Sequence, residues 1–445
     1  MRPTQLTLIA AAALLVAIGS AAAQNARHAS SGVTGSVSPA APGVTAPTPE
    51  WSGRNGASGD PDMTANAIRA AAANFHTCLE GLWPLAARRG ISRASFQRHT
   101  DSLTPDLRIM DLMDSQPEFT KSFWDYLDLL VNEARISKGR ALLAEHRDAF
   151  EAVERSYGVD RYVIAAIWGV ETNYGDIRGD RPVIRSTATL ACVGRRQKYF
   201  RSEFLSALEI LHHGHVHPSR LVGSWAGAFG PTQFMPSAYK ANAVDFDRDG
   251  RRDAVASVPD MIASTANYLK KAGWVEGHTW GYEVVVPATF NFLLADRRHA
   301  RTLSEWHRLG LVRPGGQPFP RPDDRAFLLV PAGVQGPGFL MLRNFRAIMG
   351  YNPAEAYALA IGHLSDRLRG GDAFAQDWPR YERVLTRGER LELQQLLSQH
   401  GYDVGEPDGR MGSRTRTAIR QFQTKTGRIP DGFASAGLLD RLRSR

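Results

Sequence analysis

The stretch DRYVIAAIWGVETNYG, residues Asp160–Gly175, carries the most informative pattern in this chain. Asp160 is of the type that caps helix N-termini and Gly175 of the type that ends helices, so the stretch predicts a helix. One face of this helix carries four residues at helical spacing, namely Ile164, Ile167, Trp168 and Glu171. A carboxyl group at the end of an apolar stripe is poorly hydrated, which favours its protonated form, as a general acid requires. The position equally suits a carboxylate that pairs with an arginine or reaches water at the helix edge.

Helical spacing of apolar residues extends on both sides of this stretch, from about residue 62 to about residue 275. Examples are Phe75–Ala87, Glu118–Val131 and Arg140–Tyr157. Two short runs rich in β-formers and broken by Pro and Gly, Tyr282–Phe290 and Phe327–Val330, instead predict a small β-lobe. Helical spacing returns at Phe345–Arg369. The predicted fold class is therefore mainly α, with α+β character in the lobe.

The last segment, residues 384–445, predicts an independent domain of three short helices. Thr386 and Glu389 form a capping-box sequence before a leucine-rich helix, which Gly401 ends. The apolar residues expected on the faces of the next two helices are Ile419, Phe422, Leu438, Leu439 and Leu442. The segment holds 11 Lys and Arg against 7 Asp and Glu, so it is basic by itself.

The N-terminus has the three parts of an export signal. Arg2 lies in a short charged region, an apolar run of 14 residues (Leu6–Gly19) follows, and small residues up to Ala23 form a cleavage site. The run is too short to cross a membrane as a helix, which needs about 20 residues. No cysteine follows it for lipid attachment. The sequence thus predicts a signal peptide over residues 1–23, cleavage near Ala23 and an exported chain without a membrane anchor.

Composition divides the rest of the chain into domains and linkers. Residues 24–61 are rich in Ala, Gly, Ser, Pro and Thr, which predicts a disordered linker. Residues 62–370 are expected to form the main domain, residues 371–383 a second linker and residues 384–445 the C-terminal domain.

The charge of the chain restricts its partners. Its 445 residues include 54 Lys and Arg against 45 Asp and Glu, a net charge of +9. A hydrophobic share of 43% and a charged share of 22% fit a globular protein and exclude a disordered chain, a collagen and a polytopic membrane protein. The excess of basic residues indicates an acidic partner. Nucleic acid is not expected, because the chain has an export signal and no nucleic-acid motif.

The two cysteines, Cys78 and Cys192, are too few for a disulfide framework or a four-cysteine zinc site. In the oxidising compartment that an export signal implies, we expect them to form one disulfide, which closes a loop of about a hundred residues. Two buried thiols are the alternative.

The segment GSWAGAFGPTQFMPSAY, residues Gly223–Tyr239, predicts a binding loop. Its glycines allow the backbone to approach another group closely. Its polar side chains, Ser224, Thr232 and Gln233, stand among aromatic residues, a combination that suits the apolar faces and polar rim of a sugar. Ser224 is not in a nucleophile-elbow sequence, so we expect it to form hydrogen bonds. A tight loop that caps the core is the alternative.

The acidic segment DFDRDGRRD, residues 245–253, is similar to the start of a calcium-binding loop. Oxygen ligands at positions 1, 3, 5 and 9 of such a loop correspond to Asp245, Asp247, Asp249 and Asp253. Position 12, where an EF-hand has a bidentate glutamate, is Ala256. Two interpretations stay open: a bound calcium ion, and a loop whose aspartates are neutralised by the neighbouring arginines.

Taken in order along the chain, these motifs resemble the lytic murein transglycosylase B family. The resemblance covers about residues 70–370 and rests on four segments: Ile164–Gly175, Ser224–Tyr239, the acidic loop with Ser264–Leu269 after it, and Gly350–Tyr357. The C-terminal segment resembles the peptidoglycan-binding domain type 1. Its matching motifs are LQQLL from Leu393, Gly401-Tyr402, DGRMG from Asp408 and Phe422-Gln423.

The resemblance implies a lysozyme-like catalytic core with Glu171 as its single catalytic carboxylate. Enzymes of this family cleave the β-1,4 bond between N-acetylmuramic acid and N-acetylglucosamine in peptidoglycan without water and without a required cofactor, and they form 1,6-anhydro-muramoyl ends. The resemblance further implies that Ser224 orients the N-acetyl group of the substrate. The residues implied to line the glycan cleft are Gln233, Tyr268, Tyr351, Asn352 and Tyr357.

Two positions depart from the pattern of the family. The lipoprotein cysteine is absent, so membrane attachment does not carry over and a periplasmic location is expected. Gly350 stands where the motif before Asn352 has an arginine.

The expected partner is the glycan strands of peptidoglycan. A muramidase-type hydrolase that uses water, and a non-catalytic cell-wall-binding protein, are the alternatives.

Overall fold

The computed structural model describes residues 51–56, 58–113 and 121–444. The chain divides into two compact units, each made of two separate stretches. The first unit comprises Met1–Pro117 and Trp168–Asn267, and the second comprises Glu118–Ile167 and Tyr268–Arg445. The expected signal peptide lies outside the described residues.

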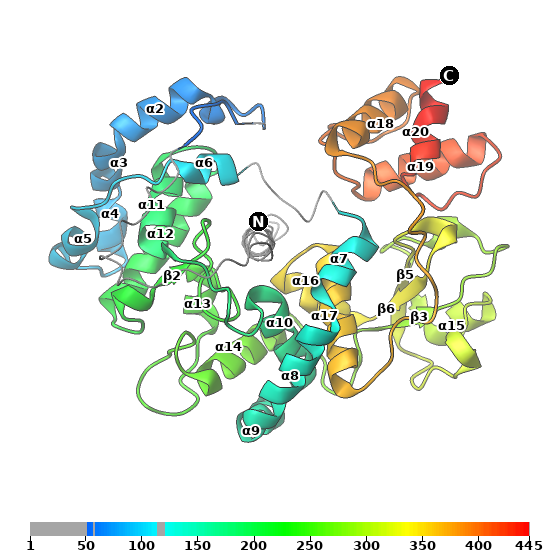
Figure 1. Ribbon diagram of the computed structural model, residues 1–445, viewed down its shortest axis with the longest axis horizontal. Helices are drawn as coiled ribbons and strands as arrows, with labels where there is room; N and C mark the ends of the chain where they lie inside the picture. Colours follow the sequence, from blue (N-terminus) through cyan, green and yellow to red (C-terminus); the bar gives the residue numbers. More distant parts are fainter. Residues whose placement is uncertain (1–50, 57, 114–120, 445) are drawn as a thin grey trace, which may run out of the picture. The chain divides into compact units, whose positions relative to one another are not determined.

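The first unit is almost entirely helical, and its helices are drawn in blue, cyan and green in Figure 1. Its helices are η2 (Pro61–Met63), α2 (Ala65–Ala73), α3 (Phe75–Gly81), α4 (Trp83–Arg88), α5 (Arg93–Thr100), α6 (Arg108–Leu112), α11 (Val183–Cys192), α12 (Gln197–His212), η4 (Pro218–Arg220) and α13 (Pro236–Asn242). The boundary between the units falls within α10 (Arg161–Thr172) and α14 (Val258–Lys271). Two short strands, β1 (Arg181–Pro182) and β2 (Val222–Gly223), pair antiparallel.

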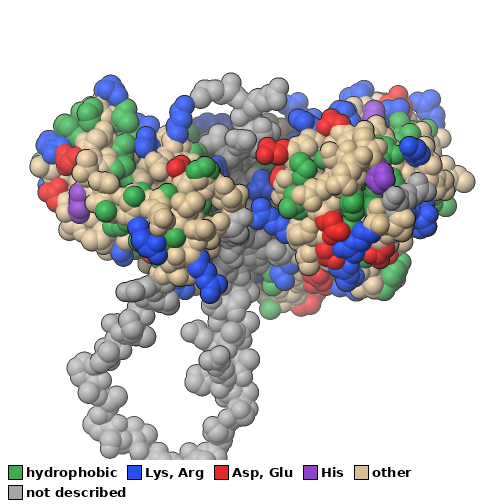
Figure 2. Space-filling view, turned by 90° about the horizontal axis from the view of Figure 1, so that it is seen from above, with side chains coloured by type: hydrophobic (Ala, Val, Ile, Leu, Met, Phe, Trp, Pro, Cys, Tyr) green, Lys and Arg blue, Asp and Glu red, His purple; other side chains and the backbone are tan. Residues whose placement is uncertain are grey.

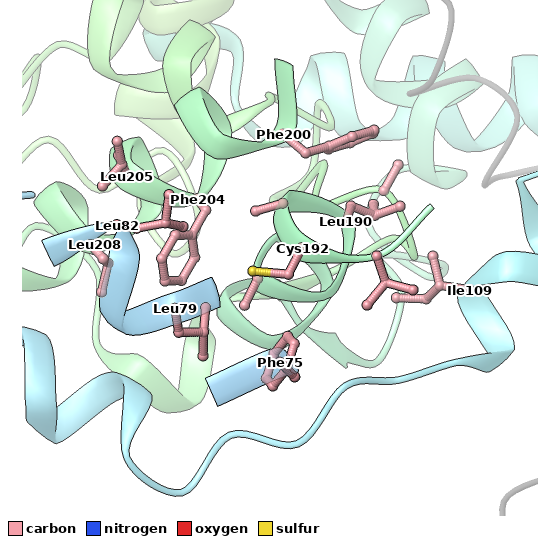
Figure 3. Close-up of a cluster of buried hydrophobic side chains, with 14 of the residues drawn as sticks. Phe75, Leu79, Leu82, Ile109, Leu190, Cys192, Phe200, Phe204, Leu205 and Leu208 are labelled. Carbon is pink, nitrogen blue, oxygen red and sulfur yellow. The ribbon is translucent and has the colours of Figure 1, made fainter. Parts of the chain in front are cut away.

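The core of the first unit forms where α3, α4 and α5 pack against α11 and α12. Its buried cluster includes Phe75, Leu79, Leu82, Phe96, Leu190, Phe200, Phe204 and Leu208. Figure 3 shows part of this cluster, with side chains that come from segments more than a hundred residues apart in the sequence. The helical spacing predicted for Phe75–Ala87 is present, but the helix breaks at Leu82, because Pro84 can begin a new helix only in its first turn.

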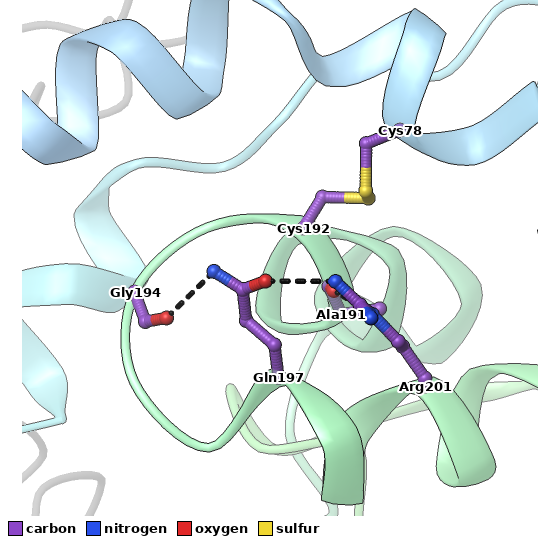
Figure 4. The surroundings of a disulfide bond; sticks show 6 residues. All are labelled: Cys78, Ala191, Cys192, Gly194, Gln197 and Arg201. Carbon is purple, nitrogen blue, oxygen red and sulfur yellow. Dashed lines mark hydrogen bonds between the residues drawn. A yellow bond between two sulfur atoms is a disulfide. The ribbon is translucent and has the colours of Figure 1, made fainter. Parts of the chain in front are cut away.

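A disulfide joins Cys78 of α3 to Cys192 at the end of α11, with the two Cα atoms 5.9 Å apart (Figure 4). Hydrogen bonds hold the turn that follows Cys192. The Gln197 side-chain amide donates to the Gly194 carbonyl (3.0 Å), and the Arg201 guanidinium donates to Gln197 Oε1 (3.0 Å) and to the Ala191 carbonyl (3.2 Å). The first unit is therefore closed covalently across its core.

Residues 51–61, which belong to the stretch expected to be disordered, lie against the first unit where the structure describes them. Trp51 packs on the buried cluster, with the guanidinium of Arg69 5.4 Å from its ring centre. Ser52 donates to the Asp111 carboxylate through its backbone N–H (2.9 Å) and its hydroxyl (2.6 Å). The prediction of disorder was wrong for these residues, because composition does not reveal that a single tryptophan finds an apolar surface.

The second unit combines helices with a four-stranded antiparallel sheet of order β3-β6-β5-β4. The strands are β3 (Gly281–Val284), β4 (Arg301–Thr302), β5 (Arg325–Leu329) and β6 (Gly338–Met341), and α15 (Leu303–Arg308) packs with them in a core that contains Val284, Trp306, Leu328 and Leu340. The lobe also contains η5 (Phe292–Leu294), η6 (Pro314–Gly316) and η7 (Gly333–Gln335). The predicted β-lobe is thus confirmed.

The other helices of this unit before the C-terminal domain are α7 (Phe123–Leu130), α8 (Glu133–Glu145), α9 (Arg147–Tyr157), α16 (Arg343–Tyr351) and α17 (Glu355–Arg369). The two long helical runs predicted here are each divided. His146 separates α8 from α9, and Pro353 lies between α16 and α17, where a proline cannot continue a helix.

The C-terminal domain consists of α18 (Arg387–Gln399), α19 (Ser413–Lys425) and α20 (Ala436–Arg443), drawn in orange and red in Figure 1. Its core contains the predicted residues Ile419, Phe422, Leu438, Leu439 and Leu442, together with Leu393 and Leu397. The capping box is confirmed, because the Thr386 hydroxyl accepts from the Glu389 N–H and the Glu389 carboxylate accepts from the Thr386 N–H.

Residues 371–383, expected to be a linker, lie on the second unit. Phe374 stacks on His363 of α17, with ring centres 3.8 Å apart, and burial lowers the pKa of His363 to about 3, so the ring is neutral in this stack. The Glu283 carboxylate of β3 accepts from the backbone N–H groups of Ala375 (2.8 Å) and Gln376 (2.9 Å). The segment before the C-terminal domain is therefore held in place.

The surface carries both signs of charge. On the face shown in Figure 2, basic side chains (blue) are interspersed with acidic ones (red). None of the helices in the described part of the chain is long and apolar enough to span a membrane.

Candidate active site

The C-terminal end of α10 places Glu171 in the interior of the protein. Its side chain is only 1% exposed, and its neighbours on the helix, Trp168 and Thr172, are also buried. At the other end of the helix, Asp160 accepts a hydrogen bond from the Tyr162 N–H (2.8 Å), so it caps the helix as predicted. A carboxyl group that stands on a rigid helix and is withdrawn from bulk water suits general acid catalysis.

The chain leaves α10 through an unusual turn. Asn173, Tyr174 and Gly175 follow one another with φ values of 51°, 60° and 93°, so two residues with a side chain adopt the left-handed conformation. The turn folds the Tyr174 ring back over Gly169, where a Cβ would lie 2.6 Å from the ring, and sets it edge-on to Trp168. Such strained backbone gathers at functional sites, and here it ends the helix directly after Glu171.

Thr172 connects this helix end to the glycine-rich loop predicted from residues 223–239. Its buried hydroxyl donates to the Pro231 carbonyl (2.6 Å) and accepts from the Gly175 N–H (2.9 Å). The residue directly after Glu171 therefore determines where the loop lies. This role could not be predicted from the sequence, because a threonine at the end of a helix has many uses.

Close backbone contacts shape the loop itself. A Cβ on Gly223 would overlap the Ala228 carbonyl oxygen, and a Cβ on Gly179 would overlap the Gly223 carbonyl. Within the turn, Ser224 donates from its N–H to Ala228 O (2.8 Å), and its hydroxyl accepts from Ala228 N–H (3.1 Å). The glycines thus allow two backbone segments to lie in contact, as the sequence predicted for this loop.

Gln233 is the second polar residue of the loop. It has a left-handed backbone (φ 53°), and its side-chain amide donates to the carbonyls of Gly230 (2.9 Å) and Arg178 (3.2 Å). Its side chain is 5% exposed and that of Ser224 is 6% exposed. Glu171, Ser224 and Gln233 all belong to the first unit, and the Thr172 clasp holds the segments that carry them together.

Glu203 is a buried carboxylate that the sequence analysis missed. It lies on α12, is 1% exposed and accepts from the backbone N–H (2.9 Å) and the hydroxyl (2.6 Å) of Ser237, at the start of α13. Burial raises its pKa, although the bonds from Ser237 oppose this effect. It anchors the end of the loop. Its position between Phe200 and Phe204 in the apolar stripe of α12 is the signal that could have revealed it.

The second unit holds the other predicted cleft residues. The Tyr268 hydroxyl donates to the Gly350 carbonyl (2.7 Å), and its ring meets Tyr351 edge-on with centres 4.8 Å apart. Asn352 accepts from the Ala354 N–H (3.0 Å) and is 2% exposed. Tyr357 has no exposed surface. Tyr268, Tyr351 and Asn352 thus lie around one turn, and Tyr357 lies inside the fold.

The acidic loop brings three of its four predicted ligands together. Carboxylate oxygens of Asp245, Asp247 and Asp249 lie within 4.8 Å of one another. Asp253 is outside this group, because its Oδ1 accepts from the N–H groups of Val255 (3.0 Å) and Ala256 (2.9 Å). Oxygen ligands at this spacing fit a hard cation such as calcium. The loop is also held by Asp260, whose carboxylate accepts from three of its backbone N–H groups.

Two protein families match separate segments of the chain. Residues 74–366 match the family described as "Transglycosylase SLT domain". The chain belongs to this family of lytic transglycosylases. Residues 386–442 match a second family, "Putative peptidoglycan binding domain", over the three C-terminal helices.

Individual relatives of this transglycosylase are similar in sequence and structure. The membrane-bound lytic murein transglycosylase B of Escherichia coli K12 is 31% identical over 268 residues, which are 58% of this chain and 72% of the relative. SltB3 of Pseudomonas aeruginosa, solved in complex with NAG-NAM-pentapeptide, is 44% identical with a TM-score of 0.81 and covers 83% of this chain and 99% of its own. Slt35 of Escherichia coli, solved in complex with calcium, is 26% identical with a TM-score of 0.56. The match covers 71% of this chain and 95% of Slt35.

Proposed function

We propose that this transglycosylase acts in the periplasm on peptidoglycan, where it cleaves the β-1,4 bond between N-acetylmuramic acid and N-acetylglucosamine and forms 1,6-anhydro-muramoyl ends. The observation that carries the proposal is the placement of Glu171, a buried carboxyl group at the end of α10 whose neighbour Thr172 clasps the glycine-rich loop. The resolved complexes of SltB3 with NAG-NAM-pentapeptide and NAG-anhNAM-pentapeptide support this substrate and product class.

Glu171 serves as both acid and base in the proposed reaction. Its proton passes to the glycosidic oxygen as the bond to the leaving N-acetylglucosamine breaks. The carbonyl oxygen of the muramoyl N-acetyl group stabilises the resulting cation. The Glu171 carboxylate then takes the proton of the C6 hydroxyl, whose oxygen attacks C1 and closes the anhydro ring. The carboxyl group regains its proton, no water is consumed, and one carboxylate suffices where hydrolases use two.

The other predicted residues bind and position the sugar. Ser224 orients the N-acetyl group, and Gln233 contacts the sugar with a side chain whose amide nitrogen is held by the carbonyls of Gly230 and Arg178. Tyr268, Tyr351 and Asn352 contact the glycan. Tyr357, which has no exposed surface, supports these residues from inside the fold.

The reaction requires no cofactor, but calcium has a structural role in this proposal. Asp245, Asp247 and Asp249 would hold the ion, which would neutralise three close carboxylates and stiffen the loop before α14. Addition of calcium is expected to raise the thermal unfolding midpoint, and the variant Asp247→Asn is expected to abolish that rise. An equal rise in both proteins, or no rise at millimolar calcium, contradicts the assignment.

The variant Glu171→Gln tests the catalytic role, since it keeps the shape of the side chain and removes its proton. We expect the release of muropeptides from purified sacculi to fall by a factor of about 10³ or more. Glu133→Gln, at an exposed position, is the matched control and is expected to leave the rate unchanged. Release by Glu171→Gln at nearly the wild-type rate would contradict the assignment.

Mass spectrometry of the products distinguishes the proposed reaction from hydrolysis. An anhydro product is one water lighter than the product of a muramidase-type hydrolase. Products of the hydrated mass would replace the proposal by the hydrolase. Absence of any product, with retained binding to sacculi, would favour a non-catalytic wall-binding protein.

A further inference from the structure

An arginine-rich cavity lies within the second unit, between the C-terminal domain and the β-lobe, and the proposed reaction does not use it. Its volume is about 590 Å³, which is in the range of pockets that bind small organic ligands or short peptides. The strand β5, the start of α17 and the loop Gly409–Ser413 of the C-terminal domain all contribute to its walls.

Ion pairs fasten the C-terminal domain beside this cavity. Glu355, at the start of α17, accepts from Arg297 of the lobe (2.7 Å) and from Arg416 of α19 (2.8 Å). Burial alone would raise the pKa of Glu355, but the two arginines hold it below its usual value. The carboxylate is therefore charged, and its charge is already paired with the two arginines.

The other two carboxylates of the lining are also engaged. Asp296 binds Arg298 (2.9 Å) and lies 4.0 Å from Arg420 of α19, whose guanidinium also donates to the Ala295 carbonyl (2.6 Å). Asp431 accepts from the Val334 N–H of the lobe (3.1 Å) and from the Gln423 amide (2.7 Å). All three acidic side chains of the cavity thus serve to attach the domain.

The lining as a whole remains strongly basic. It contains eight Lys and Arg side chains against three Asp and Glu, a formal charge of +5, and one of these arginines, Arg383, pairs with Glu389 outside the lining (2.8 Å). Apolar groups of Phe327, Leu329, Met411 and Phe433 line the rest of the cavity. The cavity thus gathers basic side chains in one place.

Two further features make the cavity favourable to an anion. Burial, with Arg416 close by, lowers the pKa of the Arg420 guanidinium, and a bound anion would oppose this effect. The helix α19, 13 residues long, begins at this cavity with Gly412 as its N-cap, and no side chain caps its first N–H groups. Those N–H groups add to the positive potential.

We propose that this cavity binds the carboxylate-bearing stem peptide of peptidoglycan. The basic lining matches the carboxylates, and the apolar walls match the small side chains of a short peptide, whereas a neutral sugar chain would leave the charge without a counterpart. The cavity belongs in part to the segment matched to peptidoglycan-binding domains, and the identity of the ligand rests on the proposed function. Peptide recognition and bond cleavage at Glu171 thereby use different residues.

The experiment measures binding of N-acetylmuramoyl-pentapeptide to the full chain by isothermal titration calorimetry. This probe has no glycosidic bond to cleave, so the measurement does not depend on the reaction at Glu171. Arg410→Glu reverses a charge in the lining at an exposed position, and we expect it to weaken binding by about tenfold or more. Arg428→Glu makes the same change of charge at an exposed position outside the cavity and is the matched control.

Two results together support the proposal. Arg410→Glu binds the probe more weakly while Arg428→Glu does not, and the wild-type chain loses the same affinity when the carboxylates of the probe are amidated. No binding to the wild-type chain, unchanged affinity in Arg410→Glu, or an equal loss in Arg428→Glu overturns it. If Arg410→Glu weakens binding of an uncharged N-acetylglucosamine oligomer as much as it weakens binding of the peptide probe, the cavity is a glycan site and the proposal is overturned. Because activity is not the readout, failure of this proposal and failure of the proposed function are distinguishable.

Discussion

The glycine-rich loop of the first unit and the C-terminal domain of the second are held in place by different forces. The loop depends on backbone contacts that leave no room for a side chain, as at Gly223, and on the buried hydroxyl of Thr172. The C-terminal domain depends on carboxylates that are shared between arginines, as at Glu355. Close contacts are weakened by a change in side-chain size, whereas ion pairs are weakened by changes in pH and salt concentration. The segments around Glu171 are thus built for fixed positions, and the attachment of the C-terminal domain is built from charge.

Among the variants that test this comparison, the largest effect is expected from Gly223→Ala, because its new methyl group would overlap the Ala228 carbonyl. We expect a loss of about 3 kcal/mol in the free energy of unfolding, and a fall in activity of about a hundredfold as the loop shifts. Chemical denaturation and sacculus digestion measure the two. Gly81→Ala, where nothing outside the residue's own helix lies within 4 Å of the new Cβ, is the control. If both variants behave alike, the loop is not held by close contact.

Glu355→Gln comes next, because it leaves Arg297 and Arg416 facing a neutral group. We expect a loss of about 2 kcal/mol, since solvent reaches parts of both arginines. Hydrogen exchange should rise in α19 and not in α10. Glu133→Gln removes an exposed pair with Arg367 and should cost less than about 0.5 kcal/mol. Unchanged exchange in α19 would show that apolar contacts alone hold the domain.

Thr172→Val tests the hydroxyl clasp with a side chain of nearly the same shape. The Pro231 carbonyl loses its donor, which should cost about 1.5 kcal/mol. We expect kcat to fall about tenfold, because the loop is then less well positioned beside Glu171. Thr417→Val, whose hydroxyl bonds within a helix nearer the surface, provides the comparison. A wild-type kcat in Thr172→Val would show that the Thr172 hydroxyl does not position the loop for catalysis.

The smallest effects are expected from pH, and they have opposite signs at the two ends of α17. The pKa of Glu355 is lowered, so its stabilisation is present above the pKa of the unfolded chain and is lost as the pH falls through the lower folded value. Burial raises the pKa of Asp366 to about 6, so its ionisation reduces stability as the pH rises from about 4 towards 6. Unfolding midpoints measured from pH 3 to pH 7 test both effects. The loss of stability at low pH should disappear in Glu355→Gln, and the loss of stability between about pH 4 and pH 6 should disappear in Asp366→Asn.

The sequence predicted those parts of the fold that local pattern determines. The helix that carries Glu171, the β-lobe, the three C-terminal helices and the Thr386 capping box all follow from spacing and terminal residues. The helix breaks at Leu82 and His146 were not predicted, because apolar periodicity continues through a short change of direction.

The parts that could not be predicted depend on contacts between distant residues. Thr172 meets Pro231 and Glu203 meets Ser237, and neither pair leaves a trace in local composition. Trp51 and Phe374 occupy stretches whose composition indicates linkers, yet each finds an apolar partner elsewhere. The acidic motif identified Asp253 by spacing alone, whereas its carboxylate is taken up by its own loop.

The Cys78–Cys192 disulfide has a consequence for the response of the chain to proteases. It closes a ring of chain with a sequence separation of 114 residues, and the stretch 118–167 of the second unit lies inside that ring. A protease that cuts the backbone once within the ring produces two fragments that stay linked through sulfur. The nicked enzyme would remain one molecule, and its fragments would separate on a gel only after reduction.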